Sequence, residues 1–311
     1  MKLIKELLEG DRLMIQALVG SVSKGVNASG SPYLNVELRD STGTINAKKW
    51  EVDARDDEIF VAGNIVGLNI EVIKYRDSLQ AKILTATKIM ENEIDVTRFI
   101  MAPPIPKKEL MGRFNLMVDS VSDEDCKILL NYFINKFKDK LYDAPAATSV
   151  HHEFASGLLM HSLFMAETCE FIAHKYDNID RDLLITGALL HDFGKMIELE
   201  GPAVYHYSIE GKLLGHISIM CAEIRNAAQE LKIESEVPLL LEHMILSHHG
   251  KLEYGSPVLP LTKEALILSI VDLLDSKIMV ASKALDATDE GEFTQKIFHL
   301  DNSSFYKPKK R

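Results

Sequence analysis

The chain has few of the residues that mark secreted or membrane-spanning proteins. Its three cysteines are odd in number and widely spaced, so neither a disulfide framework nor a zinc knuckle is indicated, and we expect buried, reduced thiols. No stretch approaches the roughly 20 apolar residues of a membrane-spanning helix. Charged residues precede any apolar run at the start, so we expect no secretory signal. These absences predict a cytoplasmic protein without a membrane partner.

Excess positive charge is also missing. The formal net charge is −11, which argues against a protein that coats nucleic acid by bulk electrostatic attraction. Residues 1–90 nevertheless hold 12 basic and 12 acidic side chains, so the acidic excess lies entirely in residues 91–311. A carboxylate-rich second half fits either a metal site or a solvated surface. The length of 311 residues suits two domains.

The first 90 residues have the two-residue hydrophobic period of short strands. Leucine and valine alternate with polar residues through Tyr33–Asp40, and turn residues follow. Similar patterns predict further strands at Arg12–Ser23, Thr44–Trp50, Asn64–Tyr75 and Leu79–Ile89. Five strands in so short a segment predict a small closed barrel.

A change of period follows the prolines in Met101–Pro106, which forbid a helix or central strand there. Beyond them apolar residues recur at helical spacing, with Ser122 as the expected N-cap of a helix over Asp123–Tyr142. The same period predicts helices at Leu158–His174, Arg181–Leu190, Gly215–Leu231, Pro238–Leu246 and Thr262–Ala284. The expected fold is therefore α+β and multidomain: a five-stranded barrel at 1–90, a linker at 91–122, a helical domain at 123–300 and a basic tail at 301–311.

Histidines are concentrated in the helical half. Of the 11 histidines all but His299 fall between residues 151 and 249, several of them near predicted helix ends. Asp272 lies in an apolar helix, where a carboxylate is costly without a charged or polar partner. Imidazole and carboxylate together suit a first-row transition ion better than calcium; we favour manganese, with iron, cobalt and zinc as alternatives. At a helix end the adjacent His191 and Asp192 can turn toward one ion or bridge two.

The run from His191 to Lys195, together with His161 and Asp272, resembles the signature of the HD-domain phosphohydrolases. The resemblance implies a first ion on four residues, with Asp192 bridging to a second ion: His161, His191, Asp192 and Asp272. Three further histidines resemble the second-ion ligands of two-metal members: His216, His248 and His249. Lys195 would meet the charge of a phosphate, or is only a surface lysine at a helix end. Phe193 replaces a small aliphatic residue, which should affect packing alone.

The front domain resembles the OB-fold of nucleic-acid-binding proteins through the run from Leu38 to Ile45 followed by Trp50. Such barrels stack bases on aromatic side chains and track phosphates with basic ones. The candidates for contact with a single strand are Tyr33, Lys48, Lys49, Trp50 and Tyr75. Each has a structural alternative, since Trp50 can close the barrel and the lysines can solubilise an edge strand.

The order of the parts, an OB-like barrel, a proline-rich linker and an HD domain, resembles the YhaM family of 3′ to 5′ exoribonucleases over almost the full length. Ala144-Pro145-Ala146-Ala147 ahead of His151-His152, then the run from Gly157 to His161, adds to the likeness. The resemblance implies a two-metal enzyme that hydrolyses single-stranded RNA to 5′-mononucleotides, with single-stranded DNA left open. His151 and His152 either contact substrate or line the entry to a helix.

Two other functions remain open from the sequence. HD domains also hydrolyse nucleotides and cyclic dinucleotides, and the barrel would then be an oligomer contact or an effector sensor. The chain could instead be a single-strand-binding protein with a vestigial HD site, although the complete ligand set argues against decay. A homo-oligomer is also open, but no heptad pattern indicates one.

Overall fold

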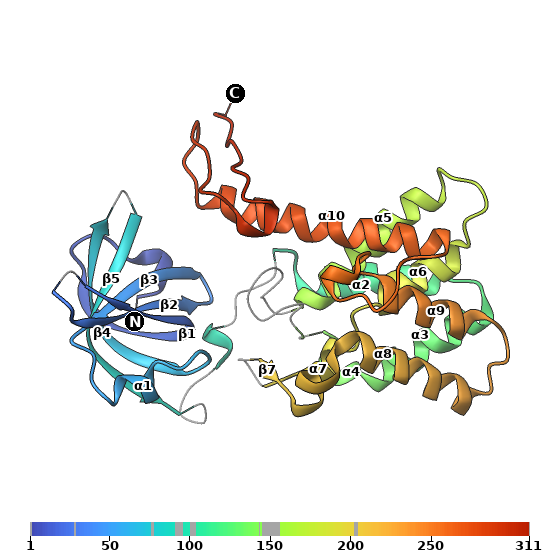
Figure 1. Cartoon of the computed structure of the whole chain (residues 1–311), viewed down its shortest axis with the longest axis horizontal. Coiled ribbons are helices and arrows are strands. Elements are labelled where there is room, and N and C mark those ends of the chain that lie inside the picture. The colour runs from blue at the N-terminus through green and yellow to red at the C-terminus, as the bar shows by residue number, and fades with distance from the viewer. Residues whose placement is uncertain are drawn as a thin grey trace. The chain divides into compact units, whose positions relative to one another are not determined.

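The computed structural model describes residues 2–27, 29–75, 78–90, 96–99, 104–142, 144, 156–201 and 205–310. The chain divides into two compact units (Figure 1). One comprises Met1–Ala102 with the short segment Glu200–His206, and the other comprises Pro103–Leu199 with Tyr207–Arg311. The predicted fold class, a five-stranded barrel followed by a helical region, is confirmed.

The first unit is a closed barrel with the strand order β1-β2-β3-β5-β4. Neighbouring strands are antiparallel except β3 and β5, which are parallel, and β1 closes the barrel by pairing with β4. A five-stranded barrel of this kind is an OB-fold. The strands are β1 (Arg12–Val26), β2 (Pro32–Asp40), β3 (Gly43–Trp50), β4 (Ile65–Tyr75) and β5 (Ser78–Ile89), with a short helix α1 (Asp56–Ile59) before β4.

Alternating apolar side chains explain why these segments form strands. Leu34, Val36 and Leu38 of β2 all point into the barrel and are almost completely buried. The expected strand bounds agree with the observed ones to within three residues. Asp40 at the end of β2 accepts hydrogen bonds from the N–H groups of Thr42 at 2.7 Å and Ile4 at 2.6 Å. These bonds fasten the chain before β1 to the β2–β3 turn.

Helices make up most of the second unit (Figure 1). They are α2 (Lys107–Asp119), α3 (Glu124–Lys136), α4 (Lys138–Leu141), α5 (Gly157–Ala173), α6 (Arg181–Leu190), α7 (Lys195–Glu198), α8 (Ile209–Leu231), α9 (Val237–Ser247) and α10 (Lys263–Asp286). Two short strands, β6 (Leu199–Glu200) and β7 (His206–Tyr207), pair between α7 and α8. Among the described residues, no helix is both long and apolar enough to cross a membrane.

One apolar core joins these helices, and α5, α6 and α10 pack against one another around it. Phe114, Phe133 and Phe193 are completely buried in this core. Phe193 meets Phe137 edge-on, with 6.1 Å between the ring centroids. The aromatic residue after Asp192 is therefore a packing residue in the structure.

The helical unit differs from the sequence expectation at its start. The apolar period did not indicate α2, which lies among the residues expected to form the linker. The single helix expected over Asp123–Tyr142 is divided into α3 and α4, because Phe137 leaves helical geometry with φ −104° and ψ 10°. The predicted N-cap at Ser122 is wrong: the carboxylate of Asp123 accepts from the N–H of Cys126 at 2.9 Å.

Helix α8 begins six residues earlier than expected and bends at Gly215. Gly215 has φ 72° and ψ 153°, a conformation that glycine adopts without the strain that a side chain would add. The bend takes the N–H of His216 out of the helical ladder, and a side-chain oxygen of Glu198 accepts it at 3.0 Å. The kink therefore fixes where His216 starts the second part of α8.

The end of the chain, expected as a basic tail, pairs back on itself. Phe293 forms an isolated bridge with Tyr306, and Ile297 forms one with Ser303. The N–H of Gly291 donates to the carbonyl of Lys307 at 2.8 Å. The chain is therefore hydrogen-bonded as far as Lys307.

Candidate metal centre and nucleic-acid surface

The seven predicted metal ligands gather in the helical unit although they come from distant parts of the chain. All are buried or half-buried. His161 lies on α5, His191 ends α6 with Asp192 after it, His216 follows the bend in α8, His248 and His249 follow α9, and Asp272 lies on α10. The helix packing thus assembles the group that the sequence motif indicated.

Asp192 lies at the centre of this group. Its Oδ1 is 3.4 Å from Nε2 of His216 and 3.8 Å from Nε2 of His248. Its Oδ2 lies 3.6 Å from Nε2 of His161 and 3.4 Å from Nε2 of His191. Two ligands that each lie about 2.1 Å from one ion are about 3 to 3.5 Å apart. The distances to His216 and His191 match this spacing and those to His161 and His248 exceed it slightly, so each carboxylate oxygen lies close to where it could share an ion with imidazole nitrogens.

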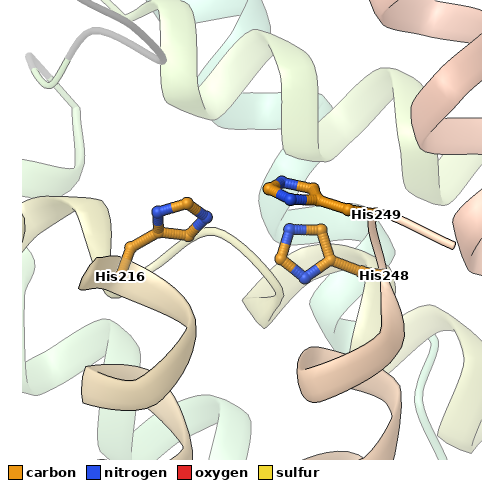
Figure 2. A group of neighbouring side chains, drawn as sticks. All are labelled: His216, His248 and His249. Atoms are coloured by element: carbon orange, nitrogen blue, oxygen red, sulfur yellow. The ribbon is translucent and has the colours of Figure 1, made fainter. Parts of the chain in front are cut away.

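The nitrogens form two separate groups. Figure 2 shows the ring of His216 facing those of His248 and His249, and their ligand atoms lie within 4.8 Å of one another. The same limit defines a second group: His161, His191 and Asp192. Asp272 adjoins the second group, since its Oδ1 is 3.5 Å from Nε2 of His161. The arrangement therefore provides two groups of atoms, each of which could hold a metal ion.

Unsatisfied polar atoms show that these residues fit a metal. Among the described residues, three buried atoms of the cluster have no hydrogen-bond partner: Oδ1 of Asp192, Nε2 of His216 and Nε2 of His248. Buried polar atoms without a partner are rare because each carries a desolvation cost. The two nitrogens lie 3.4 and 3.8 Å from Oδ1 of Asp192, so a single divalent cation could bind all three atoms.

The second nitrogen of each ligand histidine faces an oxygen. Backbone carbonyls lie 2.9 Å from Nδ1 of His191, 2.7 Å from Nδ1 of His248 and 2.8 Å from Nδ1 of His249. A carbonyl only accepts, so Nδ1 carries a proton and Nε2 is the ring nitrogen left to bind a metal. These rings are therefore in the tautomer that binds a metal through Nε2.

The other two histidines each face a carboxylate through Nδ1. Neither carboxylate was predicted from the sequence. Nδ1 of His161 lies 2.7 Å from Oδ2 of Asp275, and Nδ1 of His216 lies 3.2 Å from Oε1 of Glu198. Carboxylates in this position orient a ligand imidazole and raise its basicity. Asp275 follows Asp272 by one helical turn, so helical spacing was the available signal. Glu198 had no comparable signal, because the bend in α8 brings His216 to it.

Burial and neighbouring charged groups shift the pKa values of His161 and Asp192 in opposite directions. Burial alone would lower the pKa of His161, but hydrogen bonds to Asp272 and Asp275 raise it to about 10. Burial would raise the pKa of Asp192, but the charge of Lys195 and the nearby imidazoles hold it well below its usual range. Burial lowers the pKa of His248 well below its usual value. The carboxylates and His248 are therefore in the forms that bind metals, whereas His161 with this pKa is protonated and would release a proton on binding a metal.

Lys195 lies against the cluster. Its Nζ donates to Oδ2 of Asp192 at 2.6 Å, and its side chain is only 14% exposed. This is not the exposed helix-end lysine of the alternative interpretation. His151 and His152, the other candidates for substrate contact, lie outside the described residues.

On the barrel, three aromatic rings surround one lysine. Tyr33 and Trp50 are paired across β2 and β3, with 4.8 Å between ring centroids. Nζ of Lys48 lies 5.1, 5.5 and 6.0 Å from the ring centroids of Tyr33, Trp50 and Tyr75. OB-folds bind oligonucleotides on the face of strands 2 and 3 and at the loop between strands 4 and 5. The four residues lie on that face and at the end of β4.

Lys49 does not join this group, because neighbouring residues of a strand point to opposite faces. Its Nζ donates to the carbonyl of Trp50 at 2.9 Å and lies 3.6 Å from a carboxylate oxygen of the buried Asp56. Its side chain is 13% exposed. Lys49 therefore ties α1 to β3, and the alternation along β3 was enough to separate it from Lys48.

Known proteins resemble the chain in both units. The HD domain family matches residues 158–277. The 3′-5′ exoribonuclease YhaM of Geobacillus sp. (strain WCH70) is 40% identical over 300 residues, 96% of this chain and 93% of the relative. The second OB-fold domain of replication protein A from Methanococcus maripaludis is 20% identical, with a TM-score of 0.24 over 28% of this chain and 93% of that one. Near-complete coverage at 40% identity decides the assignment: the chain belongs to the YhaM family of 3′-5′ exoribonucleases and is a hydrolase with an HD domain.

Proposed function

We propose that this protein is a metal-dependent exoribonuclease that shortens single-stranded RNA from its 3′ end and releases 5′-mononucleotides. The observation that carries the proposal is Asp192, whose two carboxylate oxygens face separate groups of histidine nitrogens. The activity in the name of the 40%-identical relative supports the direction and the substrate. Single-stranded DNA is a second candidate substrate, since base stacking on aromatic side chains does not depend on the sugar.

Two ions would be held by the seven residues around Asp192. The first would take His161, His191, Asp192 and Asp272, and the second would take Asp192, His216, His248 and His249. When bound, such a pair supplies Lewis-acid activation of water and charge neutralisation at a phosphoryl group. Manganese is favoured, because the ligand set is too rich in nitrogen for magnesium or calcium and too rich in oxygen for a purely soft ion.

The chain's own residues orient the reaction. Asp275 and Glu198 hold the rings of His161 and His216 through Nδ1, which leaves Nε2 of each ring to bind an ion. Lys195, whose ammonium lies beside Asp192, would meet the negative charge of the scissile phosphate. Hydrolysis breaks the bond between phosphorus and the 3′ oxygen, and that oxygen takes a proton as the shortened strand leaves.

The barrel would hold the strand between cuts. Tyr33, Trp50 and Tyr75 offer rings on which bases stack, and Lys48 lies among them to meet phosphate. The equal numbers of basic and acidic residues in 1–90 would keep this binding modest and salt-sensitive. We place the enzyme in the cytoplasm, where an RNA-degrading enzyme meets its substrate. A homo-oligomer stays a prediction that sedimentation analysis tests.

The first experiment incubates the purified full chain with a 5′-labelled single-stranded oligoribonucleotide, with and without manganese. A DNA strand of the same sequence runs beside it, and so does a cyclic dinucleotide. Asp192→Ala removes the central carboxylate. His174→Ala is the matched control, since His174 ends the same helix as His161 and its side chain is 68% exposed.

We expect a manganese-dependent ladder that shortens from the 3′ end, absent in Asp192→Ala and unchanged in His174→Ala. An intact strand with a hydrolysed cyclic dinucleotide would replace the proposal with a small-nucleotide phosphohydrolase. Failure to bind any divalent ion would leave only a single-strand-binding protein.

A further inference from the structure

The loop that follows His249 is joined to the metal cluster by one hydrogen bond. Nδ1 of His249 donates to the backbone carbonyl of Tyr254 at 2.8 Å, while Nε2 of the same ring is a proposed metal ligand. A single imidazole ring therefore separates the backbone of Tyr254 from the second ion site. We call residues 250–256, between α9 and α10, the 250–256 loop.

The loop has a defined conformation. Leu252–Tyr254 form a turn of 3-10 helix, and the N–H groups of Tyr254 and Ser256 donate to the carbonyl of Lys251 at 3.1 and 3.3 Å. Gly255 follows with φ 96°, which favours glycine. The backbone bonds of this turn and the bond from Nδ1 of His249 together hold the backbone of Tyr254 in place.

The side chains of the loop form an exposed pair of a cation and an aromatic ring. Nζ of Lys251 lies 5.1 Å from the ring centroid of Tyr254, and Tyr254 is 47% exposed. Lys251 also lies 3.3 Å from Glu253, but side chains that are 57% and 69% exposed form a weak ion pair. The ammonium can therefore exchange this partner for an anionic group on a ligand.

We propose that Lys251 and Tyr254 form the subsite for the 3′-terminal nucleotide of the substrate, with Tyr254 stacking on its base and Lys251 meeting a backbone phosphate. The inference rests on the proposed function. In that reaction the phosphate of the terminal nucleotide lies at the ions, so its base lies one ribose away. The backbone of Tyr254 lies one imidazole away from a proposed ligand atom, so its exposed ring can reach that base, and every base offers a face for stacking.

A similar pair elsewhere in the helical unit supplies a matched control. Nζ of Lys175 lies 5.5 Å from the ring centroid of Phe171, and Phe171 is 64% exposed. Phe171 lies ten residues beyond His161 on α5, which is about 15 Å along a helix. The two pairs share their chemistry, but only Lys251 and Tyr254 adjoin the cluster.

The test measures KM and kcat of the full-length enzyme on two oligoribonucleotides that differ only in whether the 3′-terminal nucleotide carries a base. On the intact strand, Tyr254→Ala should raise KM by about tenfold and change kcat little, because one stacking contact is lost. On the abasic strand, wild type and Tyr254→Ala should have the same KM. Tyr254→Phe keeps the ring and should restore the wild-type value, and Phe171→Ala should leave both substrates unaffected.

Lys251→Gln should raise KM on both strands and flatten its dependence on salt, whereas Lys175→Gln should not. An equal effect of Tyr254→Ala on both strands, or no effect on either, would overturn the subsite. If wild-type enzyme cut neither strand, the proposed function itself would fail, which is a different outcome.

Discussion

The candidate metal cluster differs in burial and in hydrogen bonding from the aromatic surface of the barrel, which consists of Tyr33, Lys48, Trp50 and Tyr75. The cluster joins seven buried or half-buried residues, proposed as metal ligands, on or just after α5, α6, α8, α9 and α10, and three of its polar atoms have no hydrogen-bond partner among the described residues. The barrel surface consists of partly exposed side chains from β2, β3 and the end of β4, and Lys48 lies near three aromatic rings. The cluster thus leaves buried polar atoms unpaired among the described residues, whereas the side chains of the barrel surface contact one another.

This difference predicts how each region responds to substitution. Removing one member of a buried, mutually dependent set leaves other buried groups unsatisfied, so its effects should be large. Removing one ring from a stacking surface takes away a single contact, so its effects should be graded. Substitutions in the two regions can therefore separate catalysis from strand binding.

The largest effect should follow Asp192→Asn, which keeps the shape of the central side chain but removes its charge. We expect loss of manganese binding and of RNA cleavage together, because one carboxylate serves both groups of histidines. Calorimetric titration with Mn²⁺ and the oligoribonucleotide assay check it. Full cleavage by this variant would break the claim that the cluster is the catalytic centre.

Asp275 and Glu198 should have the next largest effects. Asp275→Ala and Glu198→Ala should each lower metal affinity by about 10- to 100-fold, because the ring of His161 or His216 loses the acceptor that orients it. Asp275→Asn and Glu198→Gln keep an oxygen acceptor and should lose less. Titration with Mn²⁺ measures the series, and equal losses for the alanine and amide variants would show that orientation is not the cause.

Trp50→Ala should weaken binding of a single-stranded oligoribonucleotide by about tenfold through the loss of one stacking contact. Manganese binding should stay at the wild-type level. Fluorescence anisotropy with labelled RNA measures the change, and Tyr176→Ala, which removes a ring that is 68% exposed on the helical unit, is the control. Similar losses for both variants would remove the special role of the barrel surface.

The smallest effects should come from substituting the adjacent lysines of β3, and the two variants should differ in which property changes. Lys48→Gln should weaken RNA binding and reduce the salt slope by about one, as expected for one lost phosphate contact. Lys49→Gln should instead destabilise the barrel by about 1 to 3 kcal/mol, because the buried Asp56 loses its cation. Anisotropy at several salt concentrations and urea denaturation separate the two. Identical behaviour of the two variants would refute the assignment of opposite faces.

Local patterns in the sequence predicted much of the fold. The two-residue period found all five strands, since one face of each strand is buried in the barrel. Helical spacing found α5, α6, α9 and α10 but missed α2 and the break at Phe137. The division at Phe137 depends on where its ring packs, against Phe133 and Phe193, and these contacts are tertiary.

Only the residues of the candidate site that belong to a sequence motif could be predicted. The adjacent His191 and Asp192 indicated the centre, and the other ligands followed from resemblance. Glu198 was not predictable, because it meets His216 only through the bend that Gly215 allows in α8. Tyr254 likewise takes its place through its backbone carbonyl, which accepts from the His249 side chain, and the identity of residue 254 does not encode that bond.

The central claim is that one carboxylate joins two metal sites. It is tested most directly by counting the Mn²⁺ ions bound per chain in wild-type protein and in His216→Ala. The account predicts two ions in the wild type and one in His216→Ala, since that histidine belongs to only one group of ligands. One ion in the wild type, or none, would contradict it.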